Sequence, residues 1–253
     1  MQLRHQGADP ALTLTDIHFS VGAARILTAV TLDLTRGETL CVIGPNGAGK
    51  TTLMNVITGT VTPQQGRVHL NGVDITRMAS HLRTRHGMAR TFQTSYLFDK
   101  LTVLDNVVLA ARGSGRGPRG RKAGVSEAAA AHDALGHVGL APRAQRPVGA
   151  LSHGERRKVE IAMALVSGAE VLLLDEPMAG VSAEDVPDLV ALIKNYVAAQ
   201  DRSIVLVEHH MDVVLELADR VAVLHHGEVL AVGTPDEVMA NEQVQTAYMG
   251  EEL

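Results

Sequence analysis

The sequence predicts an α/β fold: a core with a mainly parallel sheet, an antiparallel β subdomain and an α-helical subdomain. Three observations support this prediction. A glycine-rich loop joins an apolar strand to a helix, apolar strands alternate with helical segments after residue 170, and residues 11–35 alternate between apolar and polar side chains. Uniformly apolar strands separated by helices are typical of a parallel sheet covered on both faces. A period of two is typical of antiparallel strands with one buried face.

The first part of the chain combines this antiparallel pattern with the strand and helix that flank the glycine-rich loop. Strands are expected within 11–35 and at 39–43, followed by a helix at 50–58 that ends at Gly59. Two short strands come next, with turn signals at Gly66 and Asn71-Gly72. A helix at 76–86 and a short strand from Met88 complete this part. The Asn-Gly dipeptide is a strong hairpin signal. We assign residues 1–94 to this part, which holds the first half of the core and the antiparallel β subdomain.

Helical patterns dominate residues 95–165, which we assign to the α-helical subdomain. Helices are expected at 102–112, 126–138 and 153–167, with Thr102 and Ser126 as amino-terminal caps. Between the first two lies a basic, glycine-rich segment, Arg112 to Lys122. We interpret it as a solvated loop rather than as a contact for anionic lipid or nucleic acid.

Residues 166–253 return to strand–helix alternation and complete the core. Apolar strands are expected at 171–176, 204–208 and 221–225, with helices at 184–199 and 211–218 between them. Thr234-Pro235 then starts a terminal helix as its cap and first turn.

Composition excludes several classes of protein. The net charge of −5 gives no basic field that favours nucleic acid. The chain has one cysteine, Cys41, and so no internal disulfide, which fits a reducing compartment. It has no run of about 18 apolar residues that could span a membrane and no apolar signal region at its amino terminus. We therefore expect a cytoplasmic protein whose role at a membrane, if any, needs partner chains.

The loop Gly44 to Thr52, with the sequence GPNGAGKTT, fits the phosphate-loop pattern G-x-x-x-x-G-K-[ST]. Its backbone N–H groups and the following helix start form an anion site suited to the phosphates of a nucleotide. We expect Lys50 to reach the β- and γ-phosphates and Thr51 to bind Mg²⁺. A glycine turn without a ligand is the alternative. The expected nucleotide-binding residues of the loop are Gly44, Pro45, Asn46, Gly47, Ala48, Gly49, Lys50, Thr51 and Thr52.

Two further motifs have a chemical interpretation. The strand Val171 to Glu176 ends in two carboxylates, of which Asp175 is expected to hold Mg²⁺ and Glu176 to act as the base for the attacking water. The alternative is an acidic pair that caps the next helix. The segment Leu151 to Glu155, LSHGE, places a serine and a glycine at a helix start, where they form an anion site or only a cap.

Taken together, the motifs resemble those of the ATP-binding-cassette ATPases over nearly the whole chain. Gly44–Thr52 matches the family's Walker A motif, Gln93 its Q-loop, Leu151–Glu155 its signature motif, Val171–Glu176 its Walker B motif and His209 its switch histidine. The resemblance implies the fold of a phosphate-loop NTPase core.

The resemblance also implies how the residues act. Two such domains meet head to tail, so Ser152, Gly154 and Glu155 are expected to act on the nucleotide of the partner chain. Gln93 is expected to contact the γ-phosphate and Mg²⁺ and to link the site to a membrane-embedded partner. His209 is expected to stabilise the γ-phosphate and the attacking water, as a catalytic residue beside Glu176 and Gln93.

The sequence departs from the family pattern at several positions. His153 and Glu155 replace a glycine and a glutamine of the usual LSGGQ, and Ser182 replaces the aspartate that many members have in the D-loop. The aromatic residue that stacks on adenine is missing at its usual spacing, which falls on Val21; Phe19 is the alternative.

Longer segments resemble one group within the family. The segments from Gly87 to Val107, Leu172 to Asp185, Val207 to Val214 and Gly233 to Leu253 look like the ATPases of branched-chain amino-acid uptake systems, and also like those of urea and short-chain amide importers. The resemblance implies two transmembrane permease subunits, a periplasmic binding protein and a location on the inner face of the plasma membrane. It also implies a second cassette ATPase, usually a different chain, with identical chains as the alternative.

Three aromatic residues surround Gln93 in the sequence, namely Phe92, Tyr96 and Phe98. They either receive a permease helix or pack under the helical subdomain. Two other hypotheses are a soluble cassette ATPase of a cytosolic complex and a regulatory cassette that does not hydrolyse ATP. The sequence lacks coiled-coil insertions, tandem cassettes and a basic face, and Glu176 is present, so both are disfavoured.

Overall fold

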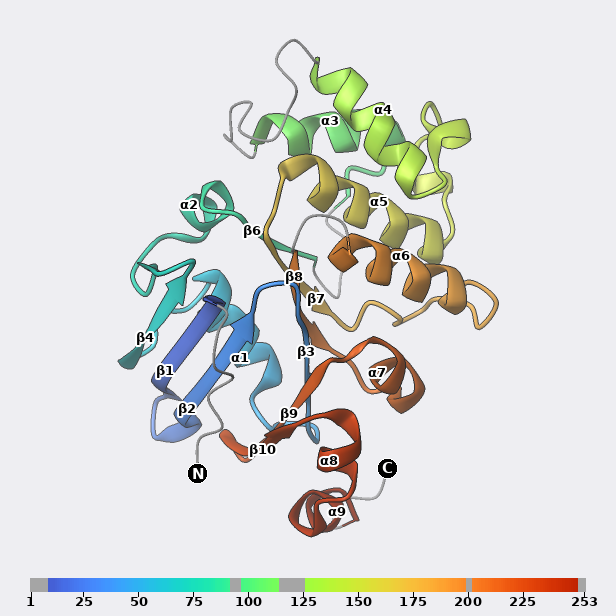
Figure 1. Ribbon diagram of the computed structural model, residues 1–253. Helices are drawn as coiled ribbons and strands as arrows, with labels where there is room; N and C mark the ends of the chain where they lie inside the picture. The colour runs from blue at the N-terminus through green and yellow to red at the C-terminus, as the bar shows by residue number, and fades with distance from the viewer. Residues whose placement is uncertain (1–8, 92–96, 114–125, 199–201, 250–253) are drawn as a thin grey trace.

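The computed structural model describes residues 9–91, 97–113, 126–198 and 202–249. These residues form two sheets, one with strand order β2-β1-β4-β5 and one with strand order β10-β9-β3-β8-β7-β6. Figure 1 shows a group of helices, α3, α4 and α5, at one end of the molecule, and α8 and α9 at the other. The predicted α/β architecture is confirmed.

The four-stranded sheet is antiparallel, as the alternation of residues 11–35 predicts. It consists of β1 (Pro10–Val21), β2 (Ala24–Thr35), β4 (Gln65–Leu70) and β5 (Val73–Asp74). The predicted hairpin at Asn71-Gly72 is confirmed, and both residues have positive φ, 49° and 78°. Gly66, however, lies inside β4 rather than at its end. A Cβ there would lie 2.3 Å from the carbonyl oxygen of Asp16, so the close approach of the two strands requires glycine.

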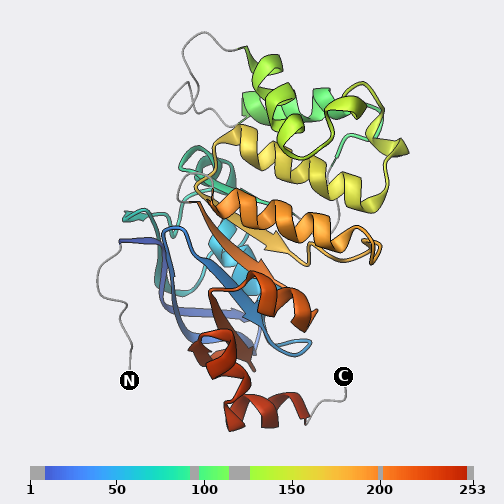
Figure 2. The same ribbon diagram turned by 45° about the vertical axis from the view of Figure 1, so that its right-hand side comes forward.

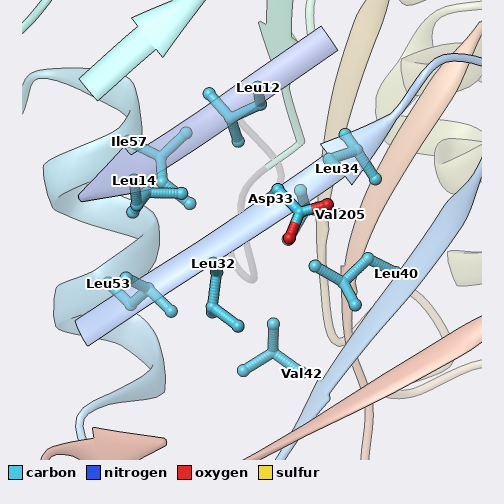
Figure 3. A pocket seen from close by; sticks show the side chains of 10 residues that line it. All are labelled: Leu12, Leu14, Leu32, Asp33, Leu34, Leu40, Val42, Leu53, Ile57 and Val205. Carbon is cyan, nitrogen blue, oxygen red and sulfur yellow. The ribbon is translucent and has the colours of Figure 1, made fainter. Parts of the chain in front are cut away.

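The helix α1 (Lys50–Thr58) packs on the inner face of this sheet. Leu53 and Ile57 of α1 face Leu12, Leu14 and Leu32 of the sheet in Figure 3. The packing leaves a cavity of about 10 Å³, lined almost entirely by aliphatic side chains. This volume is about that of one water-sized probe, so the cavity is a small packing gap and not a ligand site.

The six-stranded sheet is parallel except for its last strand, which confirms the predicted mainly parallel core. Its strands are β6 (Met88–Arg90), β7 (Val171–Asp175), β8 (Ser203–Val207), β3 (Thr39–Ile43), β9 (Arg220–His225) and the antiparallel β10 (Glu228–Gly233). Every residue of β3, β7 and β8 is buried.

Helices cover both faces of this sheet. In β3, Leu40 and Val42 belong to the core shared with α1 and the antiparallel sheet, whereas Cys41 and Ile43 belong to the core shared with helices of the other face. Those helices include α5 (His153–Ser167), α6 (Val186–Ala198) and α7 (Met211–Leu217). Burial raises the pKa of the Cys41 thiol, as expected for a small core residue.

The predicted helices of the middle segment are confirmed. They are α3 (Val103–Gly113), α4 (Glu127–His137) and α5, with two short 3₁₀ turns at Ala141–Arg143 and Val148–Ala150 between the last two. Thr102 and Ser126 are the caps: their hydroxyl oxygens accept the N–H groups of Asp105 at 3.0 Å and Ala129 at 3.2 Å. The helix α5 continues two residues beyond residue 165, and our domain boundaries stay a prediction.

Two helices differ from the prediction. The helix expected at 76–86 is shorter, α2 (Ser80–Arg85), because Asp74 accepts the backbone N–H of Thr76 at 2.9 Å and holds that residue in a turn. The terminal helix is divided into α8 (Pro235–Met239) and α9 (Glu242–Met249). Asn241 causes the division, since its side-chain oxygen accepts the N–H of Gln243 at 2.9 Å and so starts a second helix.

Candidate nucleotide site

The loop between β3 and α1 has a backbone that only glycine can supply. Gly44, Gly47 and Gly49 have φ angles of 149°, 80° and 103°. A Cβ on Gly44 would lie 2.0 Å from the carbonyl oxygen of Leu224, and one on Gly49 would lie 2.9 Å from that of Ile26. No side chain caps the start of α1. A tight loop followed by an uncapped helix start fits the phosphate groups of a nucleotide.

Lys50 lies inside this loop. Its side-chain ammonium donates hydrogen bonds to the carbonyl oxygens of Gly44 and Pro45, the latter at 2.9 Å, and the residue is 7% exposed. Thr51 is exposed on the first turn of α1 and Thr52 is half-buried. Of the other predicted loop residues, Asn46 and Gly47 are exposed, whereas Ala48 is buried.

Asp175 and Glu176 follow each other at the end of β7 but have different environments. Asp175 is buried and forms an ion pair with Arg90, with 2.9 Å between Oδ2 and Nη2. Glu176 has a positive φ of 46°, and its backbone N–H donates to the carbonyl oxygen of Val207 on β8. The next helix, α6, begins only at Val186, so the alternative that the two carboxylates cap it is wrong.

Glu176 contacts the predicted switch histidine. Its Oε1 lies 3.0 Å from Nε2 of His209, which follows the neighbouring strand β8. The His209 side chain is 43% exposed and that of Glu176 is 25% exposed. A carboxylate and an imidazole in hydrogen-bond contact, both reached by solvent, can orient a water molecule and accept its proton.

Sequence reasoning missed Glu208, which supports this pair. Its carboxylate is 1% exposed and accepts the backbone N–H groups of Met178 at 3.1 Å, His209 at 2.8 Å and His210 at 3.2 Å. It therefore joins the loop after Glu176 to the loop that carries His209. A charged residue directly after four apolar strand residues was the available signal.

The segment Leu151 to Glu155 starts α5 with a capping box. The hydroxyl of Ser152 accepts the N–H of Glu155 at 3.2 Å, and the carboxylate of Glu155 accepts the N–H of Ser152 at 3.0 Å. Glu155 also forms an ion pair with Arg143. A Cβ on Gly154 would lie 3.1 Å from Oδ2 of Asp185.

Figures 1 and 2 show α5 in the upper part of the molecule and the loop between β3 and α1 in the lower part. Within one chain, α5 therefore lies apart from the loop between β3 and α1.

The remaining predicted residues are placed only in part. Gln93, Phe92 and Tyr96 lie outside the described residues, as does most of the basic segment, residues 114–122. Phe98 is 59% exposed. Ser182 donates a hydrogen bond from its hydroxyl to Asp185 at 2.7 Å.

The two candidate stacking positions differ in exposure. Val21 is 62% exposed at the end of β1, whereas Phe19 packs in part against the core of the antiparallel sheet.

The donors available for a metal ion fit Mg²⁺ bound together with a nucleotide. Asp175 offers a carboxylate and Thr51 a hydroxyl; Mg²⁺ usually takes one or two protein oxygens and completes its shell with phosphates and water. Within the described part of the chain, no group of three or more His, Cys, Asp or Glu side chains could bind a metal alone. None of the helices described there is long and apolar enough to cross a membrane.

Comparisons with known proteins agree with this geometry. Residues 27–179 match the family described as "ABC transporter", and residues 228–253 match the family described as "Branched-chain amino acid ATP-binding cassette transporter". The chain is similar to the high-affinity branched-chain amino acid transport ATP-binding protein BraF of Pseudomonas aeruginosa, with 33% identity over 96% of this chain and 98% of BraF. Its identity to LivG of Salmonella typhimurium, which carries the same description, is 34% over 96% of this chain and 99% of LivG.

Solved structures resemble the fold over the same extent. A nucleotide-free ATP-binding cassette from an ABC transporter superposes with a TM-score of 0.86 at 29% identity, covering 96% of this chain and all of the other. An ATP-binding cassette in its ADP conformation gives a TM-score of 0.85 at 30% identity, with the same coverage. The chain therefore belongs to the ATPases of the ATP-binding-cassette transporters, and it is an ATP-hydrolysing enzyme.

Proposed function

We propose that this chain is the ATPase subunit of an importer and that it drives the uptake of branched-chain or related amino acids through separate permease subunits. The observation that carries the enzymatic part is the contact of 3.0 Å between Glu176 and His209. The match of residues 228–253 and the names of the relatives support the substrate class and favour it over urea or short-chain amides. They also disfavour a soluble cassette ATPase of a cytosolic complex.

In the proposed mechanism, the N–H groups of the loop Gly44–Thr52 and the ammonium of Lys50 hold the phosphates of ATP. Thr51 and Asp175, together with Gln93, would hold Mg²⁺, which would supply positive charge to stabilise the phosphates. Glu176 accepts the proton of the attacking water. His209 orients this water and stabilises the γ-phosphate, and Glu208 keeps the loops of both residues in place.

The proposed assembly contains two cassettes. Ser152, Gly154 and Glu155 of one chain act on the nucleotide held by the loop of the other. The separation of α5 from the phosphate loop within one chain supports this arrangement (Figure 1). The second cassette is a different ATPase subunit, with an identical chain as the alternative.

The remaining proposed partners are two transmembrane permease subunits and, indirectly, a periplasmic binding protein. The exposure of Phe98 fits the alternative in which the aromatic residues contact a permease better than the alternative in which they pack under the helical subdomain. The complex places this chain on the inner face of the plasma membrane, and nucleic acid is not a partner.

Glu176→Gln tests the catalytic proposal. The amide keeps the shape of the side chain but cannot accept the proton, so ATP hydrolysis is expected to fall by orders of magnitude while ATP still binds. Glu184→Gln, an exposed position with the same change of charge, serves as the control. Unchanged hydrolysis in Glu176→Gln would remove Glu176 as the base.

Purification of the tagged chain from detergent-solubilised membranes tests the transport proposal. We expect two multispanning proteins and a second cassette ATPase to copurify, and uptake of labelled leucine rather than labelled urea to depend on the chain. Copurification of soluble proteins alone would contradict the importer.

A further inference from the structure

Arg90 occupies a buried position between two elements that carry proposed metal ligands. It is the last residue of β6, next to β7, which ends at Asp175. The side chain of Arg90 is 7% exposed and that of Asp175 is 6% exposed. A buried charge of this kind needs several partners, so its contacts show what holds it there.

The guanidinium bridges the two elements with different nitrogen atoms. Its Nη2 donates to Oδ2 of Asp175 at 2.9 Å. Its Nη1 donates to the side-chain oxygen of Asn55 on α1 at 2.7 Å, and a longer contact of 3.4 Å reaches the hydroxyl of Thr58. The planar, forked shape of the group fixes the direction of both hydrogen bonds.

Arg90 contacts α1 on the side of the helix that also carries Thr51. Residues Thr51, Asn55 and Thr58 are spaced by four and three positions, and residues at this spacing lie on one side of a helix. The contact from Arg90 to Asn55 therefore fixes α1 one turn below Thr51, while the contact to Asp175 fixes the end of β7.

We propose that Arg90 is a positioning residue for the Mg²⁺ site, which sets the distance between Asp175 and Thr51 by joining β7 to α1. This inference rests on the proposed roles of Asp175 and Thr51. Partners that orient a metal ligand from behind typically change metal affinity by about 10–100-fold when they are removed.

The test uses Mn²⁺ as the probe, with the whole chain loaded with a non-hydrolysable ATP analogue and free Mn²⁺ measured by electron paramagnetic resonance. In Arg90→Lys the charge is kept, but one ammonium replaces the two separate nitrogen atoms that contact Asp175 and Asn55. We expect Mn²⁺ to bind at least about tenfold more weakly. Binding of the nucleotide in EDTA is expected to stay unchanged, and excess Mg²⁺ is expected to restore hydrolysis.

Asn55→Ala is the second variant, because it removes the other end of the bridge and leaves the Arg90–Asp175 pair intact. It is expected to weaken Mn²⁺ binding in the same direction. Arg67→Lys is the matched control, since Arg67 also forms an ion pair of 2.9 Å, with Asp74, but on the antiparallel sheet and with a side chain that is 70% exposed. It is expected to bind Mn²⁺ as the unmodified chain does.

Asp175→Asn distinguishes a failure of the proposed metal site from a failure of the positioning role of Arg90. If it weakens Mn²⁺ binding while Arg90→Lys and Asn55→Ala do not, the inference about Arg90 is wrong and the proposed metal site stands. If Asp175→Asn itself leaves Mn²⁺ binding unchanged, the role of Asp175 is wrong, and the inference falls with it. An equal loss in Arg67→Lys would show a general effect and would also overturn the inference.

Discussion

The side chain of Lys50 is held in place by hydrogen bonds to carbonyl groups of its own loop. Its ammonium contacts the carbonyl oxygens of Gly44 and Pro45, which keeps a positive charge at the centre of the anion site. We expect Lys50→Ala to weaken ATP binding by about 1.5–3 kcal/mol, the range for a hydrogen bond to a charged group. This corresponds to roughly a ten- to hundredfold rise in Kd. Isothermal titration with ATP measures it, with the exposed Lys194→Ala as control; wild-type affinity in Lys50→Ala would remove Lys50 from the site.

Substitution of Glu208 is expected to lower the stability of the fold as well as to disturb the loops that carry Glu176 and His209. Its carboxylate accepts three backbone N–H groups, of which that of Met178 is buried. In Glu208→Leu these donors lose their acceptor, and an unsatisfied buried donor costs about 1–3 kcal/mol. We expect urea unfolding to show a loss of about 2 kcal/mol or more in Glu208→Leu, and a smaller loss in Glu208→Gln, which keeps one oxygen. Equal stability of all three proteins would contradict this role.

At the scale of single elements, the β4–β5 hairpin contains a carboxylate with a low pKa. Hydrogen bonds from the hydroxyl and then the backbone N–H of Thr76 are the main reasons that the pKa of Asp74 is about 2 instead of 3.8. A carboxyl with a lowered pKa in the folded state adds stability above its unfolded pKa. This contribution is lost as pH falls from about 4 to about 2.

Asp74→Asn is therefore expected to be less stable than the unmodified chain at neutral pH. The difference in free energy of unfolding between the two proteins is expected to shrink as the pH falls through this window. Urea unfolding at several pH values measures it, and Asp9→Asn, an exposed carboxylate directly before β1, is the control. A difference that stays constant from neutral pH to pH 2 would show that the Thr76 hydrogen bonds do not have this effect.

The sequence predicted the long elements well because their periodicity is local. The capped helices of the middle segment and the buried strands of the parallel sheet follow from patterns within a few residues. The position of α2 could not be predicted in this way. Arg83 within α2 is 1% exposed and donates to the carbonyl oxygens of Val56 and Ile57 at the end of α1, and burial lowers the pKa of Arg83 to about 10. Such a contact spans about 26 residues of sequence and depends on the tertiary fold.

At the scale of the whole molecule, the nucleotide site also combines residues that local patterns predict with residues that only long-range contacts bring together. The motifs that supply Lys50, Asp175 and Glu176 are contiguous, so the sequence could locate them. Arg90 and Asn55 contact each other across 35 residues, and Arg90 and Asp175 across 85. No local pattern spans such separations in sequence, and only the pairing of β6 with β7 and the packing of α1 against the sheet bring the three residues together.

The separation of the phosphate loop from the start of α5 leads to a prediction about pairing. In a head-to-tail dimer, each site takes Lys50 from one chain and Ser152 from the other. For the alternative in which two identical chains pair, we expect ATP to cause dimer formation on size-exclusion chromatography in the Glu176→Gln background. Adding Lys50→Ala or Ser152→Arg is expected to prevent it, the first by loss of a phosphate contact and the second by bulk at an exposed helix start.

Mixing the Lys50→Ala chain with the Ser152→Arg chain tests whether each nucleotide site is formed by two chains or by one chain alone. A mixed pair holds one site with both defects and one site with neither, because the intact loop of the Ser152→Arg chain meets the intact α5 start of the Lys50→Ala chain. We therefore expect dimers to return in the mixture but in neither variant alone. Ser126→Arg, which removes the comparable cap of α4, controls for the loss of a helix cap, worth about 1 kcal/mol. If sites formed within single chains, no mixture of the two variants could contain an intact site, and the absence of mixed dimers would contradict the proposed arrangement.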